Sequence, residues 1–308
     1  MLFLLGILVG AGILYLAFRG SSPDPSPPAA SEESSAPEAS SETAEPRSEA
    51  RAARQDASDH VEPEDPTAMP VQSETASEEP TTPVRGVRVA LVIDDLGRSL
   101  DYLGPLEELG IPLTYAVLPF EEHTAEVVAS LRRRKVEMLL HLPMEPKNGE
   151  DPGPGALRQG MSDEELRELT LAALRAVPGA TGVNNHMGSG LSADGRSMRA
   201  VLGVLAGRNL FFLDSRTSAE SVGYKTAIEL GIPSAQRQVF LDGDPSPDAI
   251  EAQFQRLLTL ARTHGSAVAI GHPHPETLAA LASQVPKARE LGYEFVPVSF
   301  LLDRPGGE

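Results

Sequence analysis

Ionisable and polar residues recur in this chain directly after short apolar runs, and their types are those that bind metals and transfer protons. They are Asp94, Asp95, His141, Glu145, Asn184, Asn185, His186, Asp214, Arg216, His272 and His274. Two imidazoles and one or two carboxylates can hold Zn²⁺ or a similar divalent ion and leave a coordination position open for water. That water would become acidic near neutral pH and act as a nucleophile. A second carboxylate could take its proton, and a histidine from another loop could protonate the leaving group.

Each of these residues also has a plain structural interpretation. His141 lies inside an apolar run, where a hydrogen-bonded core histidine is common. Glu145 could be a solvated loop residue, and Asp214 could form a structural ion pair with Arg216. Asp242 also follows an apolar run, and we interpret it as part of the turn before the next helix. No single motif is specific, but the repetition of such residues at equivalent positions indicates a common site.

Alternating strand-like and helical segments must position these residues. The predicted strands are Val87–Ile93, Leu113–Leu118, Val136–Leu142, Ala180–Val183, Leu210–Leu213, Val239–Leu241, Ser266–Ile270 and Phe295–Val298. The predicted helices are Ser162–Ala176, which opens with a capping box to Glu165, and Met198–Gly207, Ser218–Leu230, Pro247–His264 and Pro275–Leu291. Strand and helix alternate about seven times, which predicts a parallel sheet or a barrel. The carboxyl ends of such strands share one face, so we expect the polar residues to meet in one cleft.

Composition excludes several classes of function. The net charge is −18, but the segment from Gly20 to Pro83 carries fifteen acidic residues against three arginines, a net of −12, so the remainder is only mildly acidic. The chain has no basic stripe, which argues against nucleic-acid binding. It has no cysteine, so disulfides, thiolate metal sites and cysteine nucleophiles are excluded. Neither a phosphate-binding P-loop nor a strand-linked G-x-G-x-x-G is present, so we expect no nucleotide.

The N-terminal part differs from the rest. Met1–Phe18 is an uncharged apolar run that ends at Arg19, long enough to cross a membrane if it stands nearly upright. No basic segment or clear cleavage site marks a signal peptide, so we favour an uncleaved anchor over a cleaved signal or a buried helix. The following Ser, Pro and Glu-rich stretch predicts a disordered spacer. We therefore predict an anchor at 1–19, a linker at 20–83 and an extracytoplasmic domain at 84–308.

Several segments of the predicted domain resemble the divergent polysaccharide deacetylase family. They are VALVIDDLG (89–97), HLPME (141–145), PGALRQGM (154–161), GVNNHMGS (182–189), FFLDSRTS (211–218), QVFLD (238–242) and IGHP (270–273). The resemblance implies a distorted (β/α)₇ barrel like that of ordinary carbohydrate esterase deacetylases. Those enzymes remove acetyl groups from N-acetylated glycans with the help of a divalent metal.

The resemblance also implies roles for the first two motifs. In the first motif, Asp94 would be the catalytic base and Asp95 a metal ligand. In the second motif the ordinary family has two histidine ligands spaced i, i+4. Here His141 matches the first, but Glu145 stands at the second position. Either Glu145 ligates the metal or His186 replaces the missing histidine, and we favour His186 because it keeps the ordinary set of ligands.

The late motifs complete the implied site. His272 would be the catalytic acid, and Asp214 and Arg216 would orient His272 or the base, although Asp214 could instead contact substrate. The resemblance thus predicts a metal-dependent hydrolase, with Zn²⁺ as the expected metal, that acts on an acetylated glycan of the cell envelope. The alternative is a catalytically inactive protein that kept the fold and binds a glycan or a protein partner.

Overall fold

The computed structural model describes residues 83–304 of the chain. The predicted anchor at 1–19 and almost all of the linker predicted at 20–83 lie outside the described residues and stay predictions. Within residues 83–304, no helix combines the length and the apolar character needed to cross a membrane.

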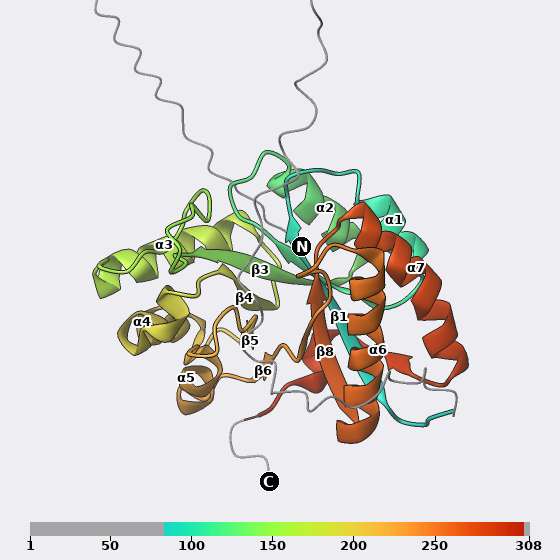
Figure 1. The fold of residues 1–308 in the computed structure, drawn as a ribbon. Helices are drawn as coiled ribbons and strands as arrows, with labels where there is room; N and C mark the ends of the chain where they lie inside the picture. The colour runs from blue at the N-terminus through green and yellow to red at the C-terminus, as the bar shows by residue number, and fades with distance from the viewer. Residues whose placement is uncertain (1–82, 305–308) are drawn as a thin grey trace, which may run out of the picture. The chain divides into compact units, whose positions relative to one another are not determined.

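A curled sheet of nine strands forms the centre of the described domain (Figure 1). The strands are β1 (Arg88–Leu96), β2 (Thr114–Val117), β3 (Glu137–Met144), β4 (Gly182–Met187), β5 (Phe211–Asp214), β6 (Ser234–Gln236), β7 (Val239–Phe240), β8 (Ser266–Gly271) and β9 (Glu294–Phe295). Their order is β6-β5-β4-β3-β2-β1-β8-β7, with β9 beside β1. Every ladder between these strands is parallel, which confirms the parallel α/β class.

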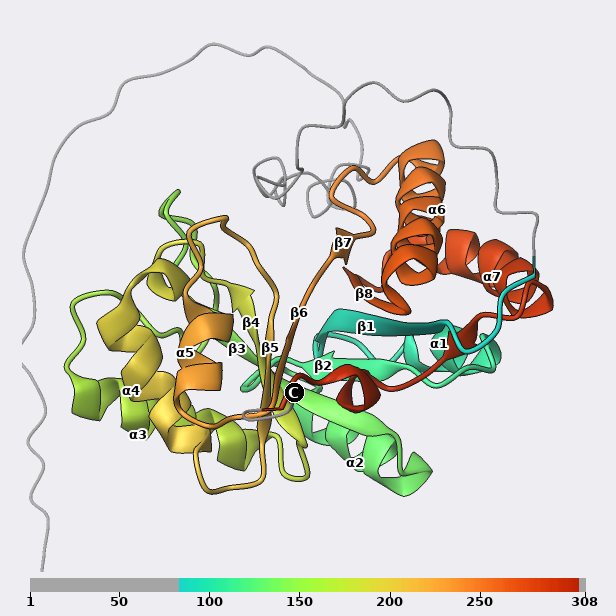
Figure 2. The same ribbon diagram turned by 90° about the horizontal axis from the view of Figure 1, so that it is seen from below.

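The two ends of this sheet are consecutive pieces of one segment. Strand β6 pairs with β5, and β7 pairs with β8, although only Arg237 and Gln238 separate β6 from β7 along the chain. No ladder joins β6 to β7 among the described strands, so the sheet is an open, curled half-barrel (Figure 2). The sequence predicted β7 as Val239–Leu241 but missed β6, which is too short to show a pattern.

Helices cover the outer face of the sheet. They are α1 (Leu103–Glu108), α2 (Thr124–Arg134), α3 (Asp163–Ala176), α4 (Gly195–Leu205), α5 (Gly223–Glu229), α6 (Pro247–His264) and α7 (Pro275–Glu290), with 3₁₀ turns η1 (Leu191–Ala193) and η2 (Val298–Leu301). The predicted capping box of Ser162 and Glu165 is present at the start of α3. Helices α6 and α7 begin at proline, as the sequence predicts. Proline is well tolerated there because the backbone N–H that it lacks would have no hydrogen-bond partner within the first turn of the helix. For helices α1 and α2 no bounds were predicted from the sequence.

Two apolar clusters sandwich the sheet, and they sort the residues of each strand by alternation. On β1, Val89, Leu91 and Ile93 belong to the outer cluster under the helices. Ala90 and Val92 belong to the inner cluster, inside the curl. Successive side chains on a strand point to opposite faces, so every second residue of a strand faces the inside of the curl. We call these inward-facing residues the inner series of that strand.

Candidate active site and metal centre

The inner series of several strands changes from apolar to ionisable residues at the carboxyl end. On β1 the inner Ala90 and Val92 are followed by Asp94, and on β3 the inner Leu139 is followed by His141. Beyond β8 the inner Ile270 is followed by His272. The alternation therefore collects polar side chains at the open mouth of the curl, above a small apolar floor. This is the convergence that the sequence predicted.

Asp95 joins its neighbour in the pocket because the backbone departs from regular strand geometry there. Its φ is 58°, a left-handed value that a non-glycine residue adopts at a cost, and the register of β1 with β2 shifts between Ile93 and Leu96. Met187, the last residue of β4, and Arg216, two residues after β5, have φ of 50° and 49°. Three of the six non-glycine residues with positive φ in the described part of the chain therefore lie at or next to the mouth of the curl, and such strain is common at functional sites.

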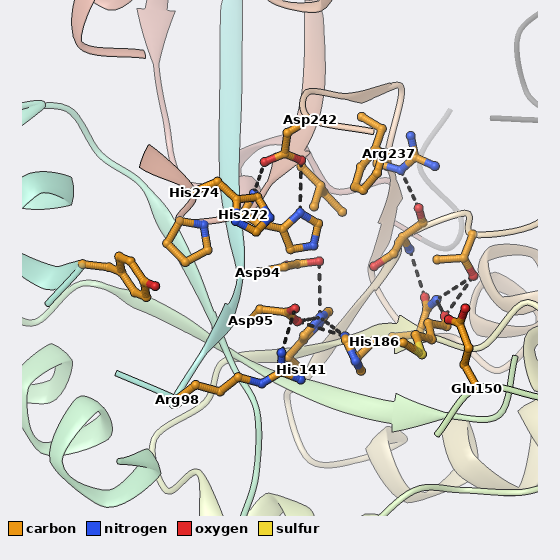
Figure 3. Close-up of a pocket in the computed structure, with 18 of the residues that line it drawn as sticks. Asp94, Asp95, Arg98, His141, Glu150, His186, Arg237, Asp242, His272 and His274 are labelled. Atoms are coloured by element: carbon orange, nitrogen blue, oxygen red, sulfur yellow. Dashed lines mark hydrogen bonds and ion pairs between the residues drawn. The ribbon is translucent and has the colours of Figure 1, made fainter. Parts of the chain in front are cut away.

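The mouth holds a pocket of about 600 Å³. Its polar lining includes Asp94, Asp95, Arg98, His141, Asn185, His186, Arg237, Asp242, His272 and His274. Figure 3 shows Asp95, His141 and His186 turned toward one another, with Asp242, His272 and His274 on the opposite side and Asp94 between the two groups. The pocket therefore contains two polar groups from different halves of the sheet.

Three potential metal ligands meet on the first side. Asp95 Oδ1 lies 2.9 Å from His186 Nδ1 and 3.2 Å from His141 Nε2. The two imidazole nitrogens are 3.2 Å apart. Ligand atoms about 2.0–2.2 Å from one metal, at tetrahedral or octahedral angles, would be separated by about 3.0–3.5 Å. The donor set and its spacing therefore fit a single divalent ion, and these residues form a candidate metal-ligand group.

The charges of this group support one another. Burial alone would raise the pKa of Asp95, but the charge of His186 and the contacts of both imidazoles hold that pKa well below its usual value. Burial lowers the pKa of His141, but the carboxylates of Asp94 and Asp95 more than offset this and raise it. For Asp94 burial dominates and raises its pKa despite the opposing charges of His141 and His272. Asp94 is therefore the more basic of the two carboxylates.

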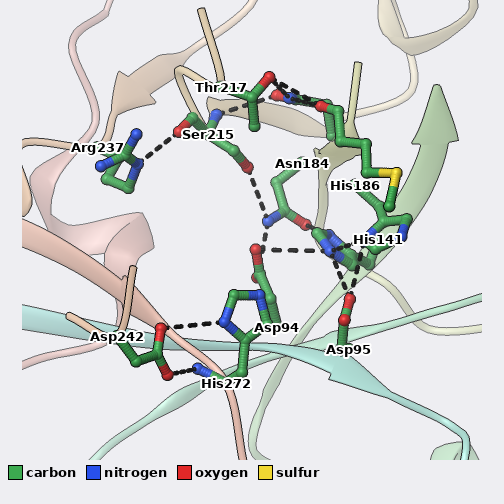
Figure 4. A network of polar contacts seen from close by, with 12 residues as sticks. Asp94, Asp95, His141, Asn184, His186, Ser215, Thr217, Arg237, Asp242 and His272 are labelled. Atoms are coloured by element: carbon green, nitrogen blue, oxygen red, sulfur yellow. Dashed lines mark hydrogen bonds and ion pairs between the residues drawn. The ribbon is translucent and has the colours of Figure 1, made fainter. Parts of the chain in front are cut away.

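Asn184 connects Asp94 with His141. Its side chain is fully buried on β4, in register with His141 of β3. Asn184 Oδ1 lies 3.0 Å from His141 Nδ1, and Asn184 Nδ2 donates to Asp94 Oδ1 at 2.9 Å and to Ser215 Oγ at 3.2 Å (Figure 4). His186 lies two residues further along β4, so alternation places both side chains on the inner face.

An Asp–His pair occupies the other side of the pocket. Asp242 Oδ1 lies 3.0 Å from His272 Nδ1, and Asp242 Oδ2 accepts hydrogen bonds from the His272 backbone N–H at 2.6 Å and from Thr277 Oγ1 at 2.8 Å. Burial would lower the pKa of His272, but the Asp242 carboxylate dominates and raises it to about 10. His272 therefore holds a proton at neutral pH.

Replacing Asp242 with Asn should lower the pKa of His272 by about 1–3 units, because the attraction of the carboxylate is lost while burial still disfavours the charged imidazole. The shift can be measured from the imidazole resonances as a function of pH in the metal-free chain. Asp244→Asn is a suitable control, because Asp244 is exposed in the same loop and accepts from the Ser246 backbone. An unchanged His272 pKa in Asp242→Asn would show that Asp242 is not its main partner.

Among the described residues, the hydrogen bonds of Asp214 and Arg216 go to neither His272 nor Asp94, so this geometry gives no support to the orienting role expected of them. Buried Asp214 accepts hydrogen bonds from Ser221 Oγ at 2.7 Å and from the backbone N–H groups of Tyr224 and Arg216, both at 2.9 Å. Arg216 donates to Gln236 Oε1 at 2.9 Å. Asp214 thus ties the end of β5 to the start of α5, and Arg216 ties the connection after β5 to β6.

The side chains that contact Asp94 and His272, the two catalytic candidates, were not predicted from the sequence to be their partners. Asp242 contacts His272, although it was interpreted as a turn residue, and Asn184 contacts Asp94. Asp242 could have been found from the sequence, because it directly follows a predicted strand, as the other candidate residues do. Arg237 was also missed; it lines the pocket and donates to the backbone carbonyl of Arg216 at 2.8 Å.

Glu145 is not part of the candidate metal-ligand group. Its carboxylate Oε2 accepts a hydrogen bond from the backbone N–H of Gln159 and so fixes the connection between β3 and α3. Among the described residues, the group on this side consists of Asp95, His141 and His186. The geometry therefore places His186, and not Glu145, beside Asp95 and His141. His274 is exposed next to His272, and its ring centroid is 5.6 Å away.

Comparisons with known proteins identify relatives of this chain. The chain is 36% identical over 205 residues to the uncharacterized protein YibQ of Escherichia coli K12, covering 67% of this chain and 64% of that protein, and so spans less than two thirds of that relative. It is 36% identical over 194 residues to an uncharacterized protein of Haemophilus influenzae, covering 63% of this chain and 69% of that protein. The crystal structure of the uncharacterized protein ATU2773 from Agrobacterium tumefaciens is similar, with 28% identity, a TM-score of 0.65, and coverage of 72% of this chain and 92% of that one.

The family model for divergent polysaccharide deacetylases matches residues 91–302. This range contains both polar groups of the pocket and, apart from the first three residues of β1, the strands that carry them. Because the match extends over most of the chain, the protein belongs to the divergent polysaccharide deacetylase family.

Proposed function

We propose that this protein is a zinc-dependent hydrolase that removes acetyl groups from an N-acetylated polysaccharide of the cell envelope. The observation that carries this proposal is the convergence of Asp95, His141 and His186 beside Asp94, with the Asp242–His272 pair across the same pocket. We also propose that the curled sheet is the distorted (β/α)₇ barrel of this enzyme class, with the segment that contains β6 and β7 crossing its opening.

The metal would be held by Asp95, His141 and His186. One carboxylate and two imidazoles suit Zn²⁺ and leave an open position, as in catalytic zinc sites. When bound, the metal would lower the pKa of a water molecule and polarise the acetyl carbonyl. The low pKa of Asp95 keeps its carboxylate ionised and ready to ligate.

Asp94 would act as the general base. The water oxygen forms a bond to the acetyl carbon, and one water proton passes to a carboxylate oxygen of Asp94. The Asp94 side chain lies beside the candidate metal-ligand group, with its Oδ2 3.5 Å from His141 Nε2. Its other oxygen, Oδ1, accepts a hydrogen bond from Asn184. Burial raises the pKa of Asp94, which makes it a better proton acceptor than an exposed aspartate.

His272 would act as the general acid. Its Nδ1 is engaged by Asp242, so Nε2 is the nitrogen free to donate a proton into the pocket. As the bond between the acetyl carbon and the amide nitrogen breaks, that proton passes to the nitrogen, and the products are acetate and a free amine. Asp242 stays ionised throughout, because its pKa is lowered by His272 despite its burial.

The surroundings of the site are consistent with a sugar substrate. A volume of about 600 Å³ is within the range of pockets that bind small ligands. Tyr102 and Phe240 supply aromatic surface in the lining. The apolar run Met1–Phe18 and the acidic spacer after it support, from the sequence alone, an anchored domain outside the cytoplasm with access to envelope glycans.

The direct test is release of acetate from N-acetylated chitin oligosaccharides and peptidoglycan fragments by the full-length chain. We expect release that stops after EDTA treatment and returns with Zn²⁺, because the water nucleophile needs the metal. Chemically de-N-acetylated oligosaccharides, which should release nothing, are the matched control. A zinc-loaded protein that binds these glycans but never releases acetate would instead support the inactive, glycan-binding alternative.

A further inference from the structure

The buried amide of Asn184 lies between two residues with different proposed tasks. It contacts the base Asp94 through Nδ2 and the metal ligand His141 through Oδ1, at 2.9 and 3.0 Å. Asn184 has no exposed surface, so it cannot exchange these partners for water. A buried amide is costly unless its polar atoms are hydrogen-bonded, and here both ends are used.

The orientation of this amide follows from its partners. The Nδ2 end faces two acceptors, the Asp94 carboxylate and Ser215 Oγ. The reversed orientation would put a carbonyl oxygen against the Asp94 carboxylate, where two acceptors repel each other. Oδ1 must therefore face His141, and because an amide oxygen carries no hydrogen it can only accept a hydrogen bond, which His141 Nδ1–H must donate.

This orientation determines the tautomer of His141. With the ring proton held on Nδ1 by Asn184, the lone pair of a neutral His141 lies on Nε2. Nε2 is the nitrogen that faces Asp95 Oδ1 at 3.2 Å and His186 Nδ1 at 3.2 Å. A metal ligand needs that lone pair, and the partner of the other ring nitrogen is what fixes it.

We propose that Asn184 is a positioning residue that serves both halves of the reaction: its carbonyl presents the Nε2 lone pair of His141 to the metal, and its amide group holds Asp94 beside the same metal. The second half rests on the proposed hydrolase function, but the first concerns metal binding alone. Because one side chain contacts both Asp94 and His141, it fixes the base relative to the metal ligand. Two separate partners would fix their relative positions less rigidly.

The adjacent Asn185 provides a matched comparison on the same strand. It is also buried, but it points to other partners: its Nδ2 donates to the Met187 carbonyl at 2.8 Å, and its Oδ1 accepts from the Ser215 backbone N–H at 3.0 Å. It contacts neither Asp94 nor His141. Replacing Asn185 therefore costs buried hydrogen bonds, including the one to the Ser215 backbone, but leaves the contacts of Asn184 with Asp94 and His141 in place.

The test compares Asn184→Ala, Asn184→Asp and Asn185→Ala in the full-length chain, by three measurements. These are the ring ¹⁵N spectrum of His141 in metal-free protein, the Zn²⁺ affinity by chelator competition, and acetate release. Asn184→Ala should lose the fixed Nδ1–H tautomer and about 10–100-fold in Zn²⁺ affinity, the usual effect of removing a partner of a ligating histidine. Asn185→Ala should keep both tautomer and affinity.

Asn184→Asp separates the two halves of the proposal. Its carboxylate still accepts from His141 Nδ1–H, so the tautomer and the Zn²⁺ affinity should be kept, but it repels Asp94, so turnover should fall.

The proposal is overturned if Asn184→Ala keeps both the tautomer and the affinity, or if Asn184→Asp keeps full turnover. If the wild type releases no acetate, the hydrolase proposal fails, while the tautomer and affinity still decide the role of Asn184. If Asn184→Ala does not fold, the isosteric Asn184→Asp still provides the split between affinity and turnover.

Discussion

Asp94→Asn should release acetate at least about 10²-fold more slowly than the wild type while it still binds Zn²⁺. An amide of the same shape cannot accept the proton of the attacking water, which is the task proposed for Asp94. Its oxygen can still accept the hydrogen bond from Asn184, so the local packing should persist. The metal ligands Asp95, His141 and His186 are unchanged. The measurements are turnover under saturating substrate and zinc content by elemental analysis of the same preparation.

Asp101→Asn is the matched control for this variant. Asp101 lies in the connection that follows β1, is exposed, and does not line the pocket. The same change of charge there should leave turnover at the wild-type level. Normal turnover in zinc-loaded Asp94→Asn would assign the base to another group. A loss of both zinc and turnover would instead mean that Asp94 is a ligand.

The sequence predicted that the polar residues converge in one pocket, but it predicted too short a strand for β4. Strand β4 was predicted as Ala180–Val183 but extends over Gly182–Met187, so that Asn184 and His186 lie within it and not after it. Apolar patterning ends a strand where polar residues begin. These side chains remain buried because each has a polar partner in the pocket, and such partners come from β1, β3 and the segment after β5, which the local sequence does not reveal.

The choice between Asp214 and Asp242 shows a second limit. Both end an apolar run, so local sequence cannot rank them as the partner of His272. Strand order decides the matter, because β7 is the neighbour of β8, whereas β5 lies beyond β1, β2, β3 and β4. Phe240 pairs with Ile270, so Asp242 stands level with His272 two residues further on. Pairing between short strands that are far apart in the chain depends on tertiary packing, which cannot be predicted from the local sequence of either strand.

His186→Ala should weaken Zn²⁺ binding by more than about 100-fold, beyond the usual effect of removing a residue that only supports a ligand. His186 Nδ1 is 2.9 Å from Asp95 Oδ1 and 3.2 Å from His141 Nε2, so its loss leaves two protein ligands of the proposed three. Affinity is best measured by competition with a chelator of known strength. Thermal unfolding of the metal-free variant would separate a loss of ligand from a loss of fold.

Glu145→Gln distinguishes this arrangement from the ordinary spacing of ligands in the second motif. The Glu145 carboxylate accepts from the Gln159 backbone N–H, and a glutamine oxygen can accept the same bond, so Zn²⁺ affinity should stay at the wild-type level. The reverse result, with zinc lost in Glu145→Gln and retained in His186→Ala, would require the connection between β3 and α3 to rearrange when metal binds. The expected result means that β4 supplies the ligand that the second motif lacks. That substitution is sterically simple, because β3 and β4 are paired in register, with Pro143 opposite His186, and both strands end at the same mouth of the sheet.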